Sequence, residues 1–241
     1  MLRKPHQSRE RERPDDVCSR ETKKGLIRSF DPDDVLAHAY HRLFQQLCQE
    51  LPDPQRRFCA IVSAGPQGDR STVAINLASV AARATQAPVL LMDADTASPS
   101  LHRRFDLSPA PGLSDLVAGT AEWGVAIRKV GDQGVSILTC GGAPLSAVSL
   151  AESAGVLALL DQLRTRFGWI FADTAPLLTT PGTALFSRRA DGVLLAVRCS
   201  STRAPLVTKA VEKLNEAHAN TLGVILTQRR FVIPRYVYKR L

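Results

Sequence analysis

Short apolar runs alternate along the chain with longer segments in which apolar residues recur at helical spacing. The apolar runs predict buried strands at 59–63, 88–92, 135–140, 169–173, 192–198 and 222–227. Between and before them, amphipathic patterns predict helices over residues 34–51, 71–85, 148–167 and 204–218. Strands that alternate with helices favour an α/β fold, a doubly wound and mostly parallel sheet flanked by helices.

The two ends of the chain differ in composition from this alternating region. Residues 1–33 are charged and poor in apolar side chains, which predicts a disordered tail. Residues 34–228 form one domain-sized unit that is long enough to bury a full α/β core. Residues 229–241 form a basic tail that contains Tyr236 and Tyr238, and Pro234 argues against a core strand there.

Charge and composition narrow the classes of partner. The formal net charge of the 241 residues is +8, much of it near the two ends. A basic surface favours contact with nucleic acid or with an anionic membrane face, and a solvated charged surface is the other interpretation. Aromatic residues make up only 5% of the chain, so no base-stacking platform is indicated.

Other compositional features predict a cytoplasmic protein. No run reaches the roughly 20 apolar residues of a membrane helix, and the N-terminal residues show no secretory pattern. The five cysteines lack CxxC spacing, which is typical of reduced thiols and predicts neither a disulfide framework nor a zinc site.

The segment after the first predicted strand resembles a phosphate-binding loop with two altered positions. Residues 62–78 read Val-Ser-Ala-Gly-Pro-Gln-Gly-Asp-Arg-Ser-Thr-Val-Ala-Ile-Asn-Leu-Ala. A strand, a tight loop and a helix N-terminus bring free backbone N–H groups toward an anion. Aligning Ser71 with the last position of Gly-x-x-x-x-Gly-Lys-Ser/Thr places Arg70 on the Lys and Asp69 on the preceding Gly. The alternative interpretation is a polar strand-to-helix turn without a ligand.

Both replacements change the phosphate chemistry. Asp69 is expected to bring a negative charge and a Cβ to a position where phosphate approaches the backbone. Arg70 keeps the positive charge, but a planar guanidinium on a longer stem replaces a compact ammonium. We therefore expect weak binding of ATP or ADP, with contacts from Pro66, Gly68, Arg70, Ser71 and Thr72.

Carboxylates follow two other predicted strands. Asp93 and Asp95 come after the apolar run at 88–92, and Asp173 ends the run at 169–173. In open α/β sheets ligands bind at the carboxyl edge of the strands. A loop Ser or Thr together with a strand-end Asp holds Mg²⁺ against nucleotide phosphates, which predicts a magnesium site made of Ser71, Asp93 and Asp173.

Together these motifs resemble the cytoplasmic domain of the bacterial tyrosine kinases of exopolysaccharide and capsule synthesis, within the MinD/ParA-like group of P-loop proteins. The resemblance covers about residues 35–241. It is carried by residues 63–78, by Leu-Leu-Met-Asp-Ala-Asp and Pro-Ser-Leu-His-Arg-Arg-Phe-Asp-Leu within 90–107, and by Pro-Gly-Leu-Ser-Asp-Leu-Val-Ala-Gly at 111–119. Phe-Gly-Trp-Ile-Phe-Ala-Asp-Thr-Ala-Pro-Leu-Leu at 167–178 and Ala-Asp-Gly-Val-Leu-Leu-Ala-Val-Arg at 190–198 complete it.

The resemblance implies a site, cofactors and partners. It implies ATP or ADP with Mg²⁺, a catalytic pair of Arg70 and Asp95, and phosphate acceptors at Tyr236 and Tyr238. It also implies a membrane polysaccharide copolymerase, or chain-length regulator, as partner, a location at the inner face of the cell membrane, and a homo-oligomer.

The chain departs from the family pattern at functional positions. Asp69 and Arg70 replace the usual Gly and Lys of the loop. In addition, the N-terminal Glu-x-x-Arg-x-x-Arg pattern of the family is lost in residues 38–44, and only two C-terminal tyrosines remain. These changes suggest a degenerate member, a pseudoenzyme that regulates polysaccharide polymerisation and export. An active ATP-dependent protein-tyrosine autokinase and a ParA/MinD-like ATPase that binds DNA or membrane are the alternatives.

Overall fold

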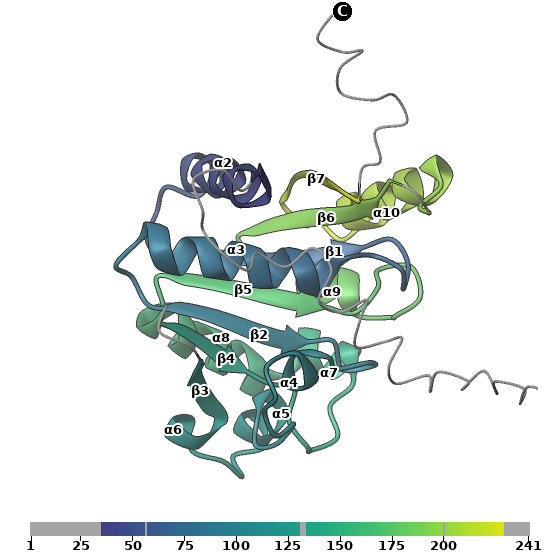
Figure 1. Cartoon of the computed structure of the whole chain (residues 1–241). Coiled ribbons are helices and arrows are strands. Elements are labelled where there is room, and N and C mark those ends of the chain that lie inside the picture. The colour runs from purple at the N-terminus through teal and green to yellow at the C-terminus, as the bar shows by residue number, and fades with distance from the viewer. Residues whose placement is uncertain (1–34, 56, 131–133, 200, 229–241) are drawn as a thin grey trace, which may run out of the picture.

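The protein, described here as a computed structural model, is built around one seven-stranded sheet (Figure 1). The structure describes residues 35–55, 57–130, 134–199 and 201–228. The strands lie in the order β3-β4-β2-β5-β1-β6-β7. Their bounds are β1 Phe58–Ser63, β2 Val89–Ala94, β3 Ile127–Val130, β4 Val135–Leu138, β5 Trp169–Thr174, β6 Gly192–Arg198 and β7 Thr221–Thr227. Among the described strands, only β3 pairs antiparallel, with β4, so the expected mostly parallel sheet is confirmed.

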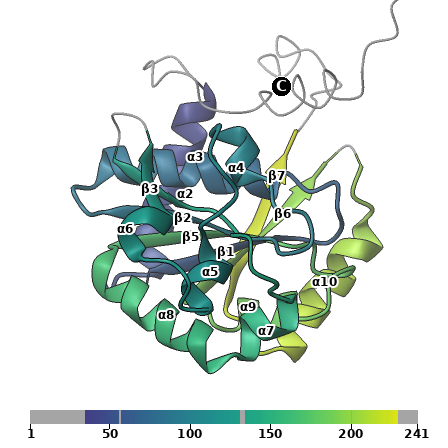
Figure 2. The same cartoon turned by 90° about the horizontal axis from the view of Figure 1, so that it is seen from below.

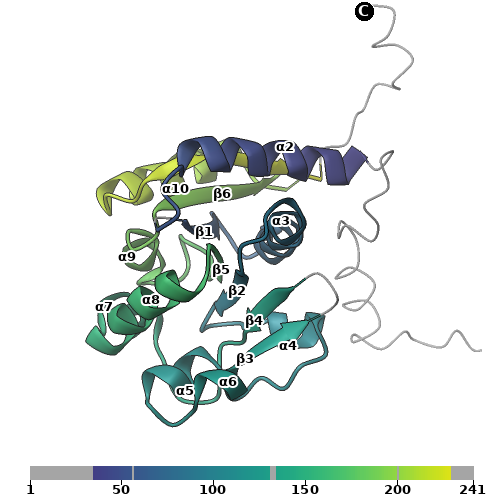
Figure 3. The ribbon, with the colours of Figure 1, turned by 90° about the vertical axis from the view of Figure 1, so that its left-hand side faces the viewer.

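Helices cover both faces of this sheet (Figures 2 and 3). One face packs against α2 (Val35–Glu50), α3 (Arg70–Ala84) and α4 (Leu101–Arg104). The other face packs against α5 (Leu113–Val117), α6 (Trp123–Ala126), α7 (Ala147–Glu152), α8 (Ala154–Arg166), α9 (Thr183–Ser187) and α10 (Ala204–Glu216). The protein therefore has two apolar cores, one on each side of the sheet.

The central strands read as continuous apolar runs because both of their faces are covered. Every residue of β1, β2 and β5 is buried, as expected for parallel strands between two helical layers. Trp169 anchors the α2 side, where its ring stacks on Phe171 and packs against Phe44. The parallel register places Asp93 directly opposite Asp173, so both strand ends reach the same edge of the sheet.

Several elements differ from the sequence prediction, which did not include the short helices α4, α5, α6 and α9. The helix predicted over 148–167 is divided into α7 and α8, because Ser153 takes an extended backbone conformation between them. Ser is favoured at such helix N-caps, and Gly155 follows in the first turn. The short strand β3 was not predicted, because the adjacent Arg128 and Lys129 leave no apolar run in it.

The predicted tails at 1–33 and 229–241 lie outside the described residues, as do the acceptor candidates Tyr236 and Tyr238. Among the described helices, none combines the length and apolar character needed to cross a bilayer.

Candidate functional site

The phosphate-loop segment connects β1 to α3 at the carboxyl edge of the sheet. Ser63 ends β1, and its hydroxyl donates to the carbonyl of Gly65 at 2.6 Å. The loop closes on itself, because the N–H of Gly68 donates to the same carbonyl at 3.3 Å. A Cβ built at Gly68 would overlap the Ser63 side chain, so only glycine fits this turn.

The side chain of Arg70 is buried inside this site. Its Nη1 donates to the Ser63 hydroxyl at 2.6 Å, and its Nη2 lies 3.1 Å from Oδ2 of Asp95. Its Nε lies 3.9 Å from Oδ1 of Asp173, and neither atom has a hydrogen-bond partner among the described residues. The guanidinium thus compensates two carboxylates at the point where the loop would receive a phosphate.

Asp69 does not act as predicted. Its carboxylate turns away from the loop and accepts hydrogen bonds from Arg198 at 2.6 Å, from Thr227 at 2.5 Å and from Gln228 at 3.3 Å. These partners lie at or just beyond the ends of β6 and β7. Arg198 pairs with the carboxylate, so the negative charge of Asp69 does not point at the position where a phosphate is expected.

Asp93 and Asp95 organise the turn after β2. Asp93 accepts N–H groups from Asp95, Ser100 and Leu101 at 3.2, 2.9 and 2.9 Å. Asp95, whose Oδ2 pairs with Arg70, accepts hydrogen bonds from the N–H groups of Ala97 and Ser98 with Oδ1, at 3.2 and 2.9 Å. Both carboxylates therefore hold the 95–101 segment in place, and Asp95 also lines the candidate site.

Burial raises the pKa of the two opposed carboxyls. The pKa of Asp93 rises to about 7, first through burial and then through the charge of Asp173. The pKa of Asp173 rises to about 6 through burial, an effect that the nearby Arg70 guanidinium and a hydrogen bond with Ser71 oppose. Because the two groups share one environment, the pair holds a proton near neutral pH more readily than two ordinary carboxyls would.

A cavity of about 1020 Å³ opens beside the loop and contains several of the predicted residues. Pro66, Gly68, Arg70, Ser71 and Asp95 all line it. Thr72 does not, because it faces a separate groove between α2 and β7. Asp93 and Asp173 are also absent from the lining, since they are buried beneath it.

The structure adds lining residues that the sequence prediction did not single out. Arg103 and Arg104 come from α4, Ser98 and Ser100 from the turn before it, and Thr179 and Thr180 from the segment after β5. Arg103 and Arg104 lie in the Ser-Leu-His-Arg-Arg stretch of the sequence, but only the fold shows that α4 lies beside the phosphate-loop segment. Arginines and hydroxyls around one cavity suit an anionic ligand.

The residues fit a nucleotide phosphate and Mg²⁺ only with a rearrangement. The cavity is lined by arginines and hydroxyls, which suit a phosphate. The Ser71 side chain hydrogen-bonds Asp173, and this hydroxyl and carboxylate suit Mg²⁺. However, the Ser71 hydroxyl also bonds that of Ser100 at 3.2 Å, and Arg70 occupies the carboxylates. The described residues contain no group of three His, Cys, Asp or Glu side chains arranged to hold a metal.

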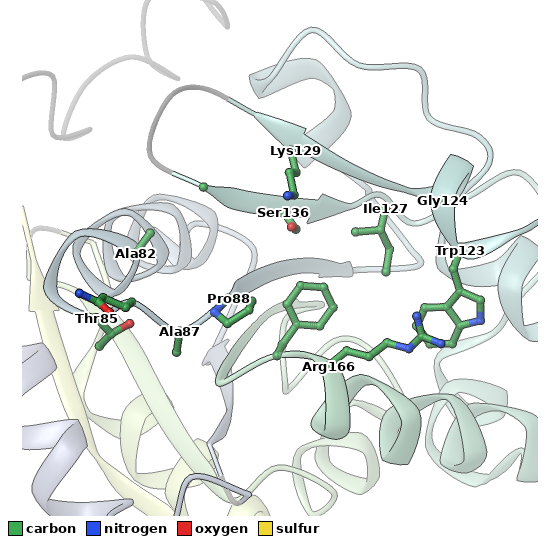
Figure 4. Close-up of a pocket in the computed structure, with 13 residues that line it drawn as sticks. Ala82, Thr85, Ala87, Pro88, Trp123, Gly124, Ile127, Lys129, Ser136 and Arg166 are labelled. Atoms are coloured by element: carbon green, nitrogen blue, oxygen red, sulfur yellow. The ribbon is translucent and has the colours of Figure 1, made fainter.

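A second cavity, of about 590 Å³, lies at the opposite end of the strands (Figure 4). Pro88, Phe167 and Gly134, each just before a parallel strand, contribute to its wall. Arg166 lies over the Trp123 ring there, 4.5 Å from its centroid. It contains none of the predicted site residues, so the loop cavity is the candidate site.

The mostly parallel sheet, with a phosphate-type loop between β1 and the N-terminus of α3, defines a P-loop NTPase fold. No protein-family model matches the chain. In solved structures, the chain is similar to the chimerical protein CapA2B2, with a TM-score of 0.79 and 26% identity over 86% of this chain and 91% of that one. The kinase domain of Escherichia coli tyrosine kinase ETK matches with a TM-score of 0.77 and 26% identity, over 85% of this chain and 81% of that one.

Sequence relatives agree with these structures. Tyrosine-protein kinase YwqD of Bacillus subtilis is 26% identical over 86% of this chain and 87% of its own length. Succinoglycan biosynthesis transport protein ExoP of Rhizobium meliloti is 30% identical over 75% of this chain, and the chain covers 23% of ExoP. The chain likewise spans only 28% of the EpsB protein of Ralstonia solanacearum. The chain belongs to the family of bacterial tyrosine kinase cytoplasmic domains, whose P-loop relatives include MinD and ParA.

Proposed function

We propose that this chain is a tyrosine-kinase-like regulator of exopolysaccharide or capsule polymerisation and export, with a degenerate phosphate site that binds ATP or ADP weakly. The observation that carries the proposal is the buried bonding of Arg70 to Ser63 and Asp95. In a working P-loop the corresponding Lys reaches the phosphates, whereas this guanidinium is already engaged.

The cost of freeing Arg70 explains why binding would be weak. Breaking a buried ion pair by removing one partner destabilises a protein by roughly 3–5 kcal/mol. If phosphate contact requires even half of that cost, affinity falls by about tenfold or more. Mg²⁺ would supply charge neutralisation to the phosphates, and Ser71, Asp93 and Asp173 are the residues that would hold it once Arg70 moves.

The partner follows from the relatives. ExoP is named for succinoglycan biosynthesis transport, and this chain corresponds to less than a quarter of its length. We infer that the partner is the cytoplasmic part of a membrane polysaccharide copolymerase, which would hold the chain at the inner face of the membrane. Self-association of the chain is a further expectation from the family.

An active autokinase is the second candidate. Ser71, Asp93, Asp95 and Asp173 are all retained, and Arg103 and Arg104 add cations to the cavity. Its phosphate acceptors would be Tyr236 and Tyr238. A ParA/MinD-like ATPase on DNA or membrane is supported only by the net charge of +8.

Calorimetric titration of the full chain with ATP and ADP, with and without Mg²⁺, tests the proposal. We expect wild-type binding to be weak and Arg70→Lys to tighten it. Mass spectrometry of the protein purified from its native host provides the second readout. Tight nucleotide binding by the wild type, together with phosphate on Tyr236 or Tyr238, would favour the active autokinase over the regulator.

A further inference from the structure

The last strand of the sheet has an unprotected apolar edge. Within the part of the chain that the structure describes, β7 lies at the end of the strand order and pairs only with β6. Its residues include no charged side chain and no proline, and Val224 and Leu226 are 46% and 61% exposed. Proteins usually cover such an edge, or protect it with charge, because unpaired strand groups recruit other strands. The opposite edge follows this rule, since β3 has only four residues and carries Arg128 and Lys129.

A groove of about 620 Å³ runs beside this edge. One wall is α2, which contributes Val35, Leu36, Ala39, Tyr40 and Leu43, and the other wall is β7 with Gln228. Asp69 and Thr72 also line the groove. The groove shares no lining residue with the phosphate-loop cavity. It is mostly apolar, and Val35 at its rim is 60% exposed, so it fits an apolar strand.

We propose that Phe231, Val232 and Ile233 of this same chain add as a strand along the edge of β7 and fill this groove. The chain leaves β7 at Thr227, and Gln228 has the left-handed φ of 51° that chain reversals use. Only Arg229 and Arg230 then precede the three apolar residues, a spacing within the range of hairpin loops.

The sequence that follows supports the same occupant. Pro234 cannot donate to a ladder and therefore ends an added strand after Ile233. The short connection gives the segment a high effective concentration at the groove, which a separate partner lacks. In an extended strand Phe231 and Ile233 share one face and Val232 takes the other, so both faces of the added strand are apolar.

The docking has a consequence for the tyrosines. Tyr236 and Tyr238 follow the docked segment within five residues, so they would be tethered beside β7. Reaching another molecule would require release of the segment from the groove. This inference does not depend on nucleotide binding at the phosphate loop.

Hydrogen exchange on the full chain tests the proposal. We expect the amides of 231–233 and the outward amides of β7 to exchange at least about tenfold more slowly in the wild type than in the Phe231→Ser/Ile233→Ser double variant. Val237→Ser, an equally apolar position beyond Pro234, is the matched control and should behave as the wild type. Unchanged exchange in β1 and β5 verifies that each variant is folded.

Two results would overturn the proposal. The first is rapid exchange of residues 231–233 in the wild type, equal to that of the double variant. The second is protection that disappears on about a hundredfold dilution while sedimentation detects a dimer, which assigns the groove to a second copy of the chain. Protection that persists in the diluted monomer supports docking within one chain.

Discussion

Arg70 and Asp95 form a buried ion pair, with Nη2 of the arginine 3.1 Å from Oδ2 of the aspartate and side chains only 9% and 5% exposed. The pair joins the first residue of α3 to the turn after β2. Both partners have further hydrogen bonds. Arg70 donates to the Ser63 hydroxyl, and Asp95 accepts from two backbone N–H groups. The position that carries Lys in a P-loop therefore has a structural role here.

Restoring the lysine should improve nucleotide binding. Arg70→Lys replaces the guanidinium fork by a compact ammonium that can leave Asp95 more readily, so we expect ATP to bind about tenfold more tightly. Asp69→Gly alone should change affinity little, because the Asp69 carboxylate already faces Arg198. Calorimetry on both single variants and on Asp69→Gly/Arg70→Lys checks this. Equal affinities for the double variant and the wild type would show that the loop is not a degraded phosphate site.

The Asp69–Arg198 pair should contribute to stability. Asp69→Asn weakens hydrogen bonds to two strand ends and leaves Arg198 without its carboxylate, so we expect a loss of about 1–2 kcal/mol in the free energy of unfolding. Asp161→Asn is the control, because its side chain is 78% exposed in a 3.5 Å pair with Arg164. Urea denaturation should show a change below about 0.5 kcal/mol for that variant. Similar losses for both would contradict a special role for Asp69.

The two loop glycines should respond differently to alanine. A Cβ at Gly68 would lie 2.5 Å from the Ser63 hydroxyl, whereas a Cβ at Gly65 meets no atom within 4 Å. We expect Gly68→Ala to lower the free energy of unfolding by about 1–3 kcal/mol through overpacking. Gly65→Ala, measured by the same thermal and urea unfolding, should be nearly neutral. The reverse order would mean that the loop is arranged differently.

The buried carboxyls predict a pH dependence of stability. The folded pKa values of about 7 for Asp93 and about 6 for Asp173 exceed the ordinary value of 3.8, so the native state binds more protons than the unfolded chain. Their contribution is complete below about pH 4 and is lost as pH rises through the folded pKa values. Because one pKa unit corresponds to about 1.4 kcal/mol, we expect the free energy of unfolding to fall by several kcal/mol across this window.

Asp173→Asn isolates this effect, because the amide does not titrate. Urea unfolding between acidic and slightly alkaline pH should show a smaller decline for Asp173→Asn than for the wild type. Asp161→Asn, which changes an exposed carboxyl, should follow the wild-type curve. A wild-type decline that Asp173→Asn reproduces in full would assign the pH dependence to other groups.

Removing the guanidinium should expose a magnesium site. In Arg70→Ala, Asp95 and Asp173 lose their nearby cation, so Mg²⁺ can take its place and stabilise the native state. We expect millimolar Mg²⁺ to raise Tm by about 2–5 °C in this variant. The wild type should respond less, even with ATP present. Sodium chloride at matched ionic strength is the control. Equal Tm increases of the wild type and Arg70→Ala with Mg²⁺ would contradict a magnesium site that Arg70 blocks.

Local patterns were sufficient to predict the main elements. The apolar runs at 59–63 and 169–173 became β1 and β5, because strands buried on both faces need apolar residues throughout. The helix predicted over 34–51 became α2, since its apolar spacing fits one buried helical face. β3 could not be predicted in this way, because only its pairing with β4 makes Ile127–Val130 a strand.

The sequence by itself determined that a phosphate-type loop precedes a helix and that acidic residues end two buried strands, because these features depend on local pattern and spacing. Only the tertiary structure decided what the charges do. Asp69 faces Arg198, 129 residues away in the chain, and Arg70 faces Asp95 and Asp173. The physical reason is that side-chain pairing depends on distances across the carboxyl edge of the sheet, and parallel strand order sets those distances.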